Sequence, residues 1–111
     1  MEAISNPVRI LVIDDQEQNR AFARAVLEDE GYETVLAASG EEGIERFREQ
    51  VPDCVLLDVR MPGLDGFATC ARIRELPLGL ETPVVFLTAQ RDLDTFDAAL
   101  RAGGECGINE R

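Results

Sequence analysis

Short apolar runs alternate along the chain with segments whose apolar residues recur at helical spacing. The runs are rich in Val, Ile and Leu and mostly lack polar alternation, which is typical of strands covered on both faces of a parallel sheet. The predicted strands occupy residues 9–15, 34–38, 54–59 and 84–89. The predicted helices occupy residues 17–30, a segment opening at Ser39, residues 65–76 and residues 93–103. This alternating order predicts right-handed crossovers and a doubly wound, three-layer α/β/α sandwich.

Signals at the helix ends agree with this reading. Ser39 and Glu42 have the spacing of a capping box, in which each side chain accepts from the other residue's backbone N–H. Gly31 suits the position just past the first helix, and Asp65 is the expected N-cap of the third. The side chains expected to face the sheet are Phe22, Val26, Leu27, Ile44, Phe47, Phe96, Ala99 and Leu100.

The composition indicates one domain with a strong acidic excess. The chain has 111 residues, and we expect a lead-in at 1–8 followed by a single domain at 9–111. Its 22 acidic and 11 basic residues give a net charge of −11. Nucleic-acid binding requires a basic face, so we predict no direct binding of nucleic acid. All basic residues are arginine, and the chain contains neither lysine nor histidine.

Membrane insertion and a zinc site are not expected. No apolar run is long enough to span a bilayer, and the start of the chain does not have the pattern of a signal peptide, so we expect a cytoplasmic protein. The three cysteines, Cys54, Cys70 and Cys106, form no CxxC pair and have no histidine to accompany them. Cys54 and Cys70 lie in a predicted strand and a predicted helix, and we expect both to be small buried hydrophobic residues.

Polar residues stand where three predicted strands end. The first strand ends in Asp14 and Asp15, the third in Asp58, and the fourth in Thr88. If the first and third strands are neighbours, about 5 Å apart, the three carboxylates converge. Two carboxylates about 4 Å apart repel by roughly 4 kcal/mol at an effective dielectric of 20, so a raised pKa or a cation must offset the repulsion. Ligands that are all oxygen favour Mg²⁺ or Mn²⁺.

Each of these residues also has an ordinary structural explanation. An aspartate after a strand is usually a turn former or a helix N-cap. Asp14 and Asp15 alone could serve only to solvate the loop that follows them, and Thr88 alone could be a strand former. Their placement at corresponding strand ends is what favours a functional site, in which the Thr88 hydroxyl could hydrogen-bond an incoming anion.

The segments "ILVIDDQEQNR", "VLLDVRMPGLDG" and "VVFLTAQ" resemble the three signature segments of the receiver domain of bacterial two-component response regulators. The resemblance extends from about Arg9 to Gly103. It implies a chemotaxis-regulator-like, flavodoxin-like sheet of strand order 2-1-3-4-5. It also implies a signalling switch and not an enzyme, with at most slow self-catalysed phosphorylation and dephosphorylation.

The resemblance implies a role for each matching residue. Asp58 would accept a phosphoryl group from a histidine kinase or phosphotransfer protein. Asp15 would bind Mg²⁺ directly and Asp14 partly through water, and Asp58 and the backbone carbonyl of Arg60 would complete the protein ligands. Thr88 would hydrogen-bond the phosphoryl group and couple it to a partner-binding face read by a downstream output protein or domain. The family further implies that the side chains of Arg60 and Gln90 tune hydrolysis, and that Pro62 and Gly66 shape the loop after Asp58.

The chain departs from the family pattern after Gly103. The family's lysine at the end of strand 5 aligns with Glu110, its proline with Arg111, and its switch aromatic with Gly107. We therefore expect a degenerate fifth strand and a missing fifth helix. The abruptness of the break favours truncation or alteration over divergence. Apolar sheet surface left uncovered would favour a homodimer or a swapped dimer.

Three functional hypotheses follow. The leading one is a phosphoacceptor receiver domain. The second is a pseudo-receiver, an interaction module with the same fold that is not phosphorylated. The third, a flavodoxin-like binder of nucleotide or flavin, is disfavoured because the loop "DDQEQN" after the first strand has no glycine and two carboxylates that would repel phosphate.

Overall fold

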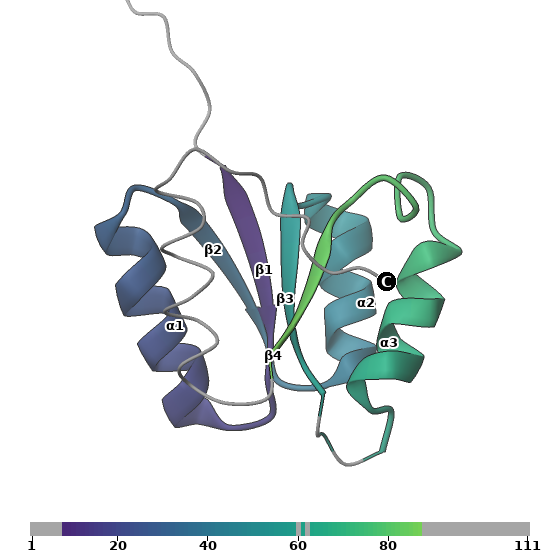
Figure 1. Cartoon of the computed structure of the whole chain (residues 1–111), viewed down its shortest axis with the longest axis horizontal. Coiled ribbons are helices and arrows are strands. Elements are labelled where there is room, and N and C mark those ends of the chain that lie inside the picture. The colour runs from purple at the N-terminus through teal and green to yellow at the C-terminus, as the bar shows by residue number, and fades with distance from the viewer. Residues whose placement is uncertain (1–7, 60, 62, 88–111) are drawn as a thin grey trace, which may run out of the picture.

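The computed structural model describes residues 8–59, 61 and 63–87. Strands and helices alternate as the hydrophobic pattern predicts (Figure 1). The elements are β1 (Arg9–Ile13), α1 (Glu17–Asp29), β2 (Glu33–Ala37), α2 (Gly40–Gln50), β3 (Cys54–Asp58), α3 (Gly66–Arg74) and β4 (Val84–Leu87). The predicted helix at 93–103 and the predicted features of a fifth strand and helix lie outside the described residues.

The four strands form one parallel sheet in the order β2-β1-β3-β4. Helix α1 covers one face, and α2 and α3 cover the other (Figure 1). The expected three-layer, doubly wound architecture is therefore confirmed, together with the first four positions of the flavodoxin-like strand order. Among the described residues, no helix is both long and apolar enough to cross a bilayer.

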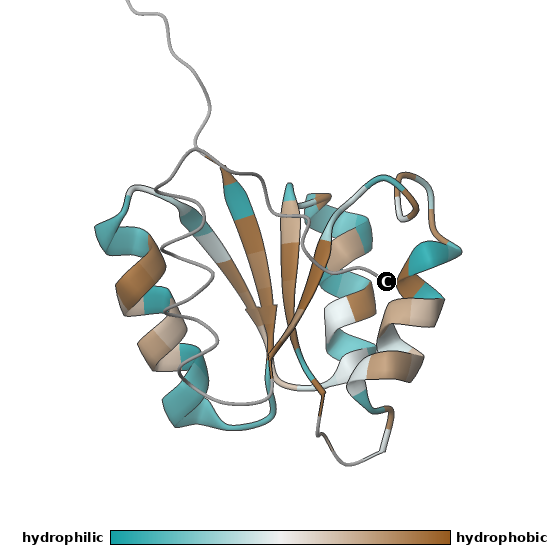
Figure 2. Ribbon diagram, in the orientation of Figure 1, coloured by the Kyte–Doolittle hydropathy of each residue, from teal (hydrophilic) through white to brown (hydrophobic). Residues whose placement is uncertain are grey.

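Each central strand is buried on both faces, which explains why its sequence lacks polar alternation. Successive side chains of a strand point to opposite faces. In β1, Ile10 and Val12 pack toward α1, whereas Leu11 and Ile13 pack toward α2 and α3, and all four are at most 1% exposed. Figure 2 shows mostly hydrophobic strands between helices in which hydrophilic and hydrophobic residues are mixed.

The helix faces and the cysteines mostly follow the sequence predictions. Leu27 and Phe47 are fully buried, and Phe22, Val26 and Ile44 are half-buried against the two cores. Of the cysteines, Cys54 is buried as expected, whereas Cys70 is only half-buried at the edge of the core between the sheet and α2–α3. Cys106 lies outside the described residues, as do Phe96, Ala99 and Leu100.

The predicted capping box of α2 is half formed. The Ser39 hydroxyl accepts from the Glu42 N–H at 3.1 Å, as expected. The Glu42 carboxylate, however, accepts from the N–H of Ala38 at 2.8 Å, so the expected return bond to Ser39 is a wrong prediction. Ala38 directly follows β2. The Glu42 carboxylate supplies its N–H with the acceptor that a neighbouring strand would otherwise provide.

The other helix ends agree with the sequence to within two residues. Gly31 adopts φ +94° after α1, and the Tyr32 N–H donates to the Leu27 carbonyl at 3.0 Å, which is the Schellman arrangement. Asp65 caps α3 by accepting from the Ala68 N–H at 2.9 Å. Helix α3 ends at Arg74, two residues before the predicted end.

Candidate functional site

The three aspartates singled out from the sequence converge at the edge of the sheet where β1 and β3 end. These strands are neighbours, and Ile13 is in register with Leu57, so the residues that follow, Asp14 and Asp58, stand at one level. Carboxylate oxygens of Asp14, Asp15 and Asp58 all lie within 4.8 Å of one another. The predicted convergence is confirmed.

The carboxylates form a cup that opens to solvent. Asp14 is buried at its base, with 6% of its surface exposed, whereas Asp15 and Asp58 are half-buried. A half-buried Asp58 leaves a carboxylate that an incoming group can approach from the end of β3. The arrangement therefore combines one recessed carboxyl group with two more accessible ones.

Asp14 is held in place by its own loop and by the first turn of α1. Its Oδ1 accepts from the Gln16 N–H at 2.9 Å and from the Asn19 side-chain amide at 3.4 Å. Burial raises the pKa of the Asp14 carboxyl, and the Asp15 carboxylate adds to the rise, while these hydrogen bonds and the Arg20 charge oppose it. The ionised form of Asp14 is thus disfavoured in the folded protein, and a nearby cation would relieve this cost.

Sequence reasoning missed Asn19 and Arg20 as parts of this site. The Arg20 guanidinium donates to the backbone carbonyl of Asp14 at 2.9 Å and brings a positive charge beside the acidic cup. Their position in the first turn of α1, which begins at Glu17, was the signal that could have found them, because side chains on the first turn of a helix lie beside the loop that precedes it. Because the chain contains neither lysine nor histidine, a positively charged side chain at this point can only be arginine.

Gly66 lets the first turn of α3 approach the end of β3. A Cβ at this position would lie 2.8 Å from the Val59 Cα and closer still to the Asp58 carbonyl oxygen. The Gly66 N–H also donates to the Val59 carbonyl at 3.2 Å. The backbone contact explains why this position has no side chain.

Gly66→Ala is expected to destabilise the protein by about 1–3 kcal/mol, because backbone atoms must move to admit the methyl group. Urea unfolding measures the change. Glu45→Ala is the control, since it also introduces an alanine into a helix and Glu45 is exposed on α2. A Gly66→Ala stability within about 0.5 kcal/mol of wild type, the usual range for surface changes, would contradict the prediction.

The remaining predicted site residues cannot be placed. Strand β4 ends at Leu87, whose carbonyl accepts from the Val59 N–H at 3.2 Å, so β3 and β4 stay paired as far as the acidic cup. The positions that lie outside the described residues are Arg60, Pro62, Thr88, Gln90, Gly107 and Glu110. Their expected roles stay predictions.

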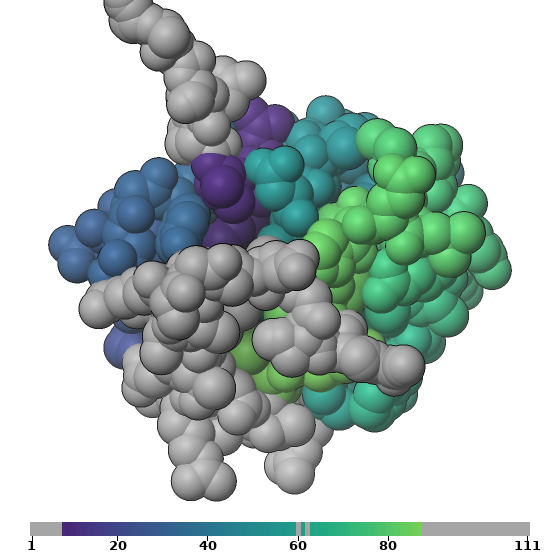
Figure 3. Space-filling model, turned by 45° about the horizontal axis from the view of Figure 1, so that its top comes forward, coloured from purple at the N-terminus to yellow at the C-terminus, as the bar shows by residue number. Residues whose placement is uncertain are grey.

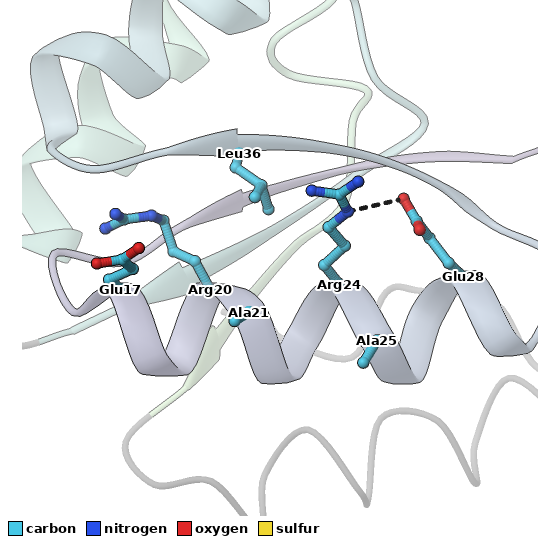
Figure 4. Close-up of a pocket in the computed structure, with 7 residues that line it drawn as sticks. All are labelled: Glu17, Arg20, Ala21, Arg24, Ala25, Glu28 and Leu36. Carbon is cyan, nitrogen blue, oxygen red and sulfur yellow. Dashed lines mark hydrogen bonds and ion pairs between the residues drawn. The ribbon is translucent and has the colours of Figure 1, made fainter.

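A groove of about 490 Å³ runs between α1 and the edge strand β2, beside the acidic cup (Figure 4). Its lining residues are Glu17, Arg20, Ala21, Arg24, Ala25, Glu28 and Leu36. Arg24 pairs with Glu28 at 3.3 Å, so the charges on its wall are partly neutralised within the groove. It contains none of the three clustered aspartates.

A parallel α/β/α sandwich with carboxylates gathered where β1 and β3 end has the architecture of a receiver domain. Residues 10–108 match the response regulator receiver domain, and the chain belongs to this family. The match continues five residues past Gly103, where the resemblance identified from the sequence ends.

Individual relatives support this assignment. The chain is 38% identical over 96 residues to the transcriptional regulatory protein AfsQ1 of Streptomyces coelicolor, with 86% of this chain and 41% of the relative covered. A putative response regulator from Chloroflexus aurantiacus is 37% identical, with a TM-score of 0.72 over 90% of this chain and 82% of the other. Chemotaxis protein CheY4 of Vibrio cholerae shares the fold, with a TM-score of 0.72, 24% identity, and 89% and 82% of the chains covered. The chain thus spans about two fifths of the length of AfsQ1.

Proposed function

We propose that this chain is a phosphoacceptor receiver domain in which Asp58 accepts a phosphoryl group from the phosphohistidine of a histidine kinase or phosphotransfer protein. The observation that carries the proposal is the cup of three carboxylates, with oxygens within 4.8 Å of one another, in a member of the receiver family. These buried and half-buried carboxylates repel one another and lose hydration, which destabilises the folded state. A function would explain why they stand at the ends of two neighbouring strands.

The residues present fit a divalent cation. The donors are carboxylate oxygens, which suit Mg²⁺ or Mn²⁺. Asp14 and Asp15 would hold the ion beside Asp58, and we propose the Arg60 backbone carbonyl as a further ligand. When bound, the ion neutralises charge on the transferring phosphoryl group.

The chain's own residues supply the nucleophile and its position. An Asp58 oxygen forms the new bond to phosphorus as the bond from phosphorus to the imidazole nitrogen of the donor breaks, and the imidazole leaves. The product is an acyl phosphate on Asp58. Thr88, the residue after β4, would hydrogen-bond this group and pass its state to a partner-binding face, and the Arg60 and Gln90 side chains would set the rate of hydrolysis.

The partners of this switch follow from its chemistry. The domain would receive its phosphoryl group from a cytoplasmic kinase or phosphotransfer protein and would signal to an output protein or domain. Such a domain is a signalling module whose only reactions are its own phosphorylation and dephosphorylation.

Incubation of the protein with acetyl phosphate and Mg²⁺ tests the proposal. Intact mass spectrometry should show one added phosphoryl group, which hydroxylamine removes because acyl phosphates react with it. Addition of EDTA before the phosphodonor should prevent the adduct. Failure to form an adduct with both a small phosphodonor and a cognate kinase in the presence of Mg²⁺ would overturn the proposal and leave an unphosphorylated interaction module.

A further inference from the structure

The peptide group that joins Asp14 to Asp15 lies between two of the three clustered carboxylates. A peptide group is planar, so its orientation sets the direction in which the chain leaves Asp14 and enters Asp15. Arg20 donates through a terminal guanidinium nitrogen to the carbonyl oxygen of this group at 2.9 Å. A hydrogen bond from a charged donor is stronger than one between neutral groups. Arg20 therefore holds the peptide group on which both carboxylates depend for their direction.

The peptide group before Asp14 is held by the sheet. The Asp14 N–H donates to the Ala37 carbonyl at 3.1 Å, which continues the pairing of β1 with β2 by one residue. With Arg20 on the following peptide group, both peptide planes that flank Asp14 are hydrogen-bonded. The Asp14 Oδ1 in turn accepts from the Gln16 N–H at 2.9 Å and from the Asn19 amide at 3.4 Å. Backbone and side chain of Asp14 are thus fixed together in the cup.

The Arg20 guanidinium reaches the cup from a firmly packed helix. Ala23 and Leu27, on the same helix, are at most 3% exposed in the core between α1 and the sheet. Figure 3 shows the surface that α1 and β2 form together, in blue at the left of the molecule. Arg20 is half-buried, and its guanidinium is directed toward the start of α1, the end that adjoins the cup (Figure 4). Ligands that are ordered in advance lose little entropy when they bind.

The charge of Arg20 and its hydrogen bond have opposite consequences for a cation in the cup. A positive charge beside a cation site repels the ion. If Arg20 acted only through its charge, its removal would strengthen metal binding. If it acts by holding the peptide group between Asp14 and Asp15, its removal frees both carboxylates and weakens metal binding. The sign of the effect on metal affinity therefore separates the two roles.

We propose that Arg20 is a positioning residue for the metal ligands. Its bond to the Asp14 carbonyl holds the Asp14 and Asp15 carboxylates in the arrangement that binds a divalent cation. The inference rests on the proposed function, because it concerns the ion of the same cup. Arg20 acts through the backbone of two ligands and is not itself a ligand, since its guanidinium is positively charged.

Electron paramagnetic resonance of Mn²⁺ at neutral pH and physiological salt tests the proposal, because the sharp signal of the free ion falls as the ion binds. Arg20→Gln should raise the Kd for Mn²⁺ by about fivefold or more, as expected for the loss of one hydrogen bond. Arg20→Lys should bind Mn²⁺ more tightly than Arg20→Gln, because the ammonium group can also donate to the Asp14 carbonyl. Circular dichroism checks that each variant is folded.

Arg24→Gln is the matched control. Arg24 lies one turn further along α1, lines the same groove as Arg20 and pairs with Glu28 at 3.3 Å. Its replacement removes the same charge but no bond to the cup, so the Kd for Mn²⁺ should stay within about twofold of wild type because salt screens the distant charge.

Equal Kd values for Arg20→Gln and Arg24→Gln, tighter binding by Arg20→Gln, or no Mn²⁺ binding by wild type would overturn the inference. The phosphoryl assay on wild type separates this outcome from failure of the proposed function. A wild type that binds Mn²⁺ but gains no phosphoryl group would refute the proposed function and leave the role of Arg20 in place. A wild type that gains the group, beside an Arg20→Gln variant that binds Mn²⁺ equally well, would refute the role of Arg20 alone.

Discussion

Asp58→Asn is expected to abolish the phosphoryl adduct while the protein remains folded. The amide has the shape of the carboxyl group but is not a nucleophile, and it removes one negative charge from a cluster whose oxygens lie within 4.8 Å of one another. Because two carboxylates at such a separation repel by about 1–4 kcal/mol between the limits of water and a protein surface, folding should not suffer. Intact mass after exposure to acetyl phosphate and Mg²⁺ measures the adduct, and circular dichroism checks the fold.

Asp65→Asn is the control for the loss of a carboxylate in the same stretch of chain. Asp65 is exposed and caps α3 through its Oδ1, and asparagine caps a helix about as well as aspartate. This variant should therefore gain the phosphoryl group as wild type does. An adduct that persists in Asp58→Asn would show that another residue accepts the phosphoryl group. An equal loss of the adduct in Asp65→Asn would show that the assay responds to any change in this loop and does not identify the nucleophile.

Asp14→Asn is expected to have opposite effects on stability and on metal binding. Asparagine keeps the Oδ1 that accepts from Gln16 and Asn19 but carries no charge. In EDTA at pH 7 the variant should be more stable than wild type, by on the order of 1 kcal/mol, because it does not bury a charge beside Asp15. With Mg²⁺ it should bind at least about tenfold more weakly, a loss of about 1.4 kcal/mol. Only wild type should therefore gain substantially in unfolding midpoint as Mg²⁺ is added.

The stability difference should depend on pH in a defined direction. Burial, with a smaller contribution from the Asp15 carboxylate, raises the pKa of Asp14 above its ordinary value of 3.8 and outweighs the hydrogen bonds and the Arg20 charge that lower it. The folded state then holds the Asp14 proton more tightly than the unfolded state, so wild type loses stability as the pH rises through 3.8 to the folded value. The greater stability of Asp14→Asn in EDTA should be fully present at pH values above the folded pKa of Asp14. It should be absent at pH values below 3.8.

Glu17→Gln supplies the control for these measurements. Glu17 is an exposed acidic residue in the first turn of α1, close in sequence to the cup but outside the cluster of three. Its replacement should change neither the stability in EDTA nor the response to Mg²⁺ to a comparable extent. An Asp14→Asn variant that is less stable than wild type in EDTA, or that binds Mg²⁺ equally well, would remove Asp14 from the metal site.

Local features of this protein could be predicted because neighbouring residues carry them. The cap at Ser39, the glycine turn at Gly31 and the N-cap at Asp65 each depend on backbone groups within a few residues, and all three are found in the structure. The return bond of the capping box failed because the Glu42 carboxylate could accept from either of two adjacent N–H groups, and the N–H of Ala38, at the sheet edge, donates to it. Sequence spacing allows both choices, whereas the surroundings select one.

The sequence by itself determined the alternation of strands and helices, the two-faced burial of the strands and the identity of the three acidic residues at the strand ends. Tertiary structure decided that β1 lies beside β3, and only this places Asp14 and Asp15 next to Asp58, more than 40 residues away in the chain. It likewise decided the raised pKa of Asp14, the position of Arg20 and the need for glycine at position 66. The physical reason is that propensity and periodicity act over a few residues, whereas desolvation, charge repulsion and backbone contact depend on which distant segments are brought together.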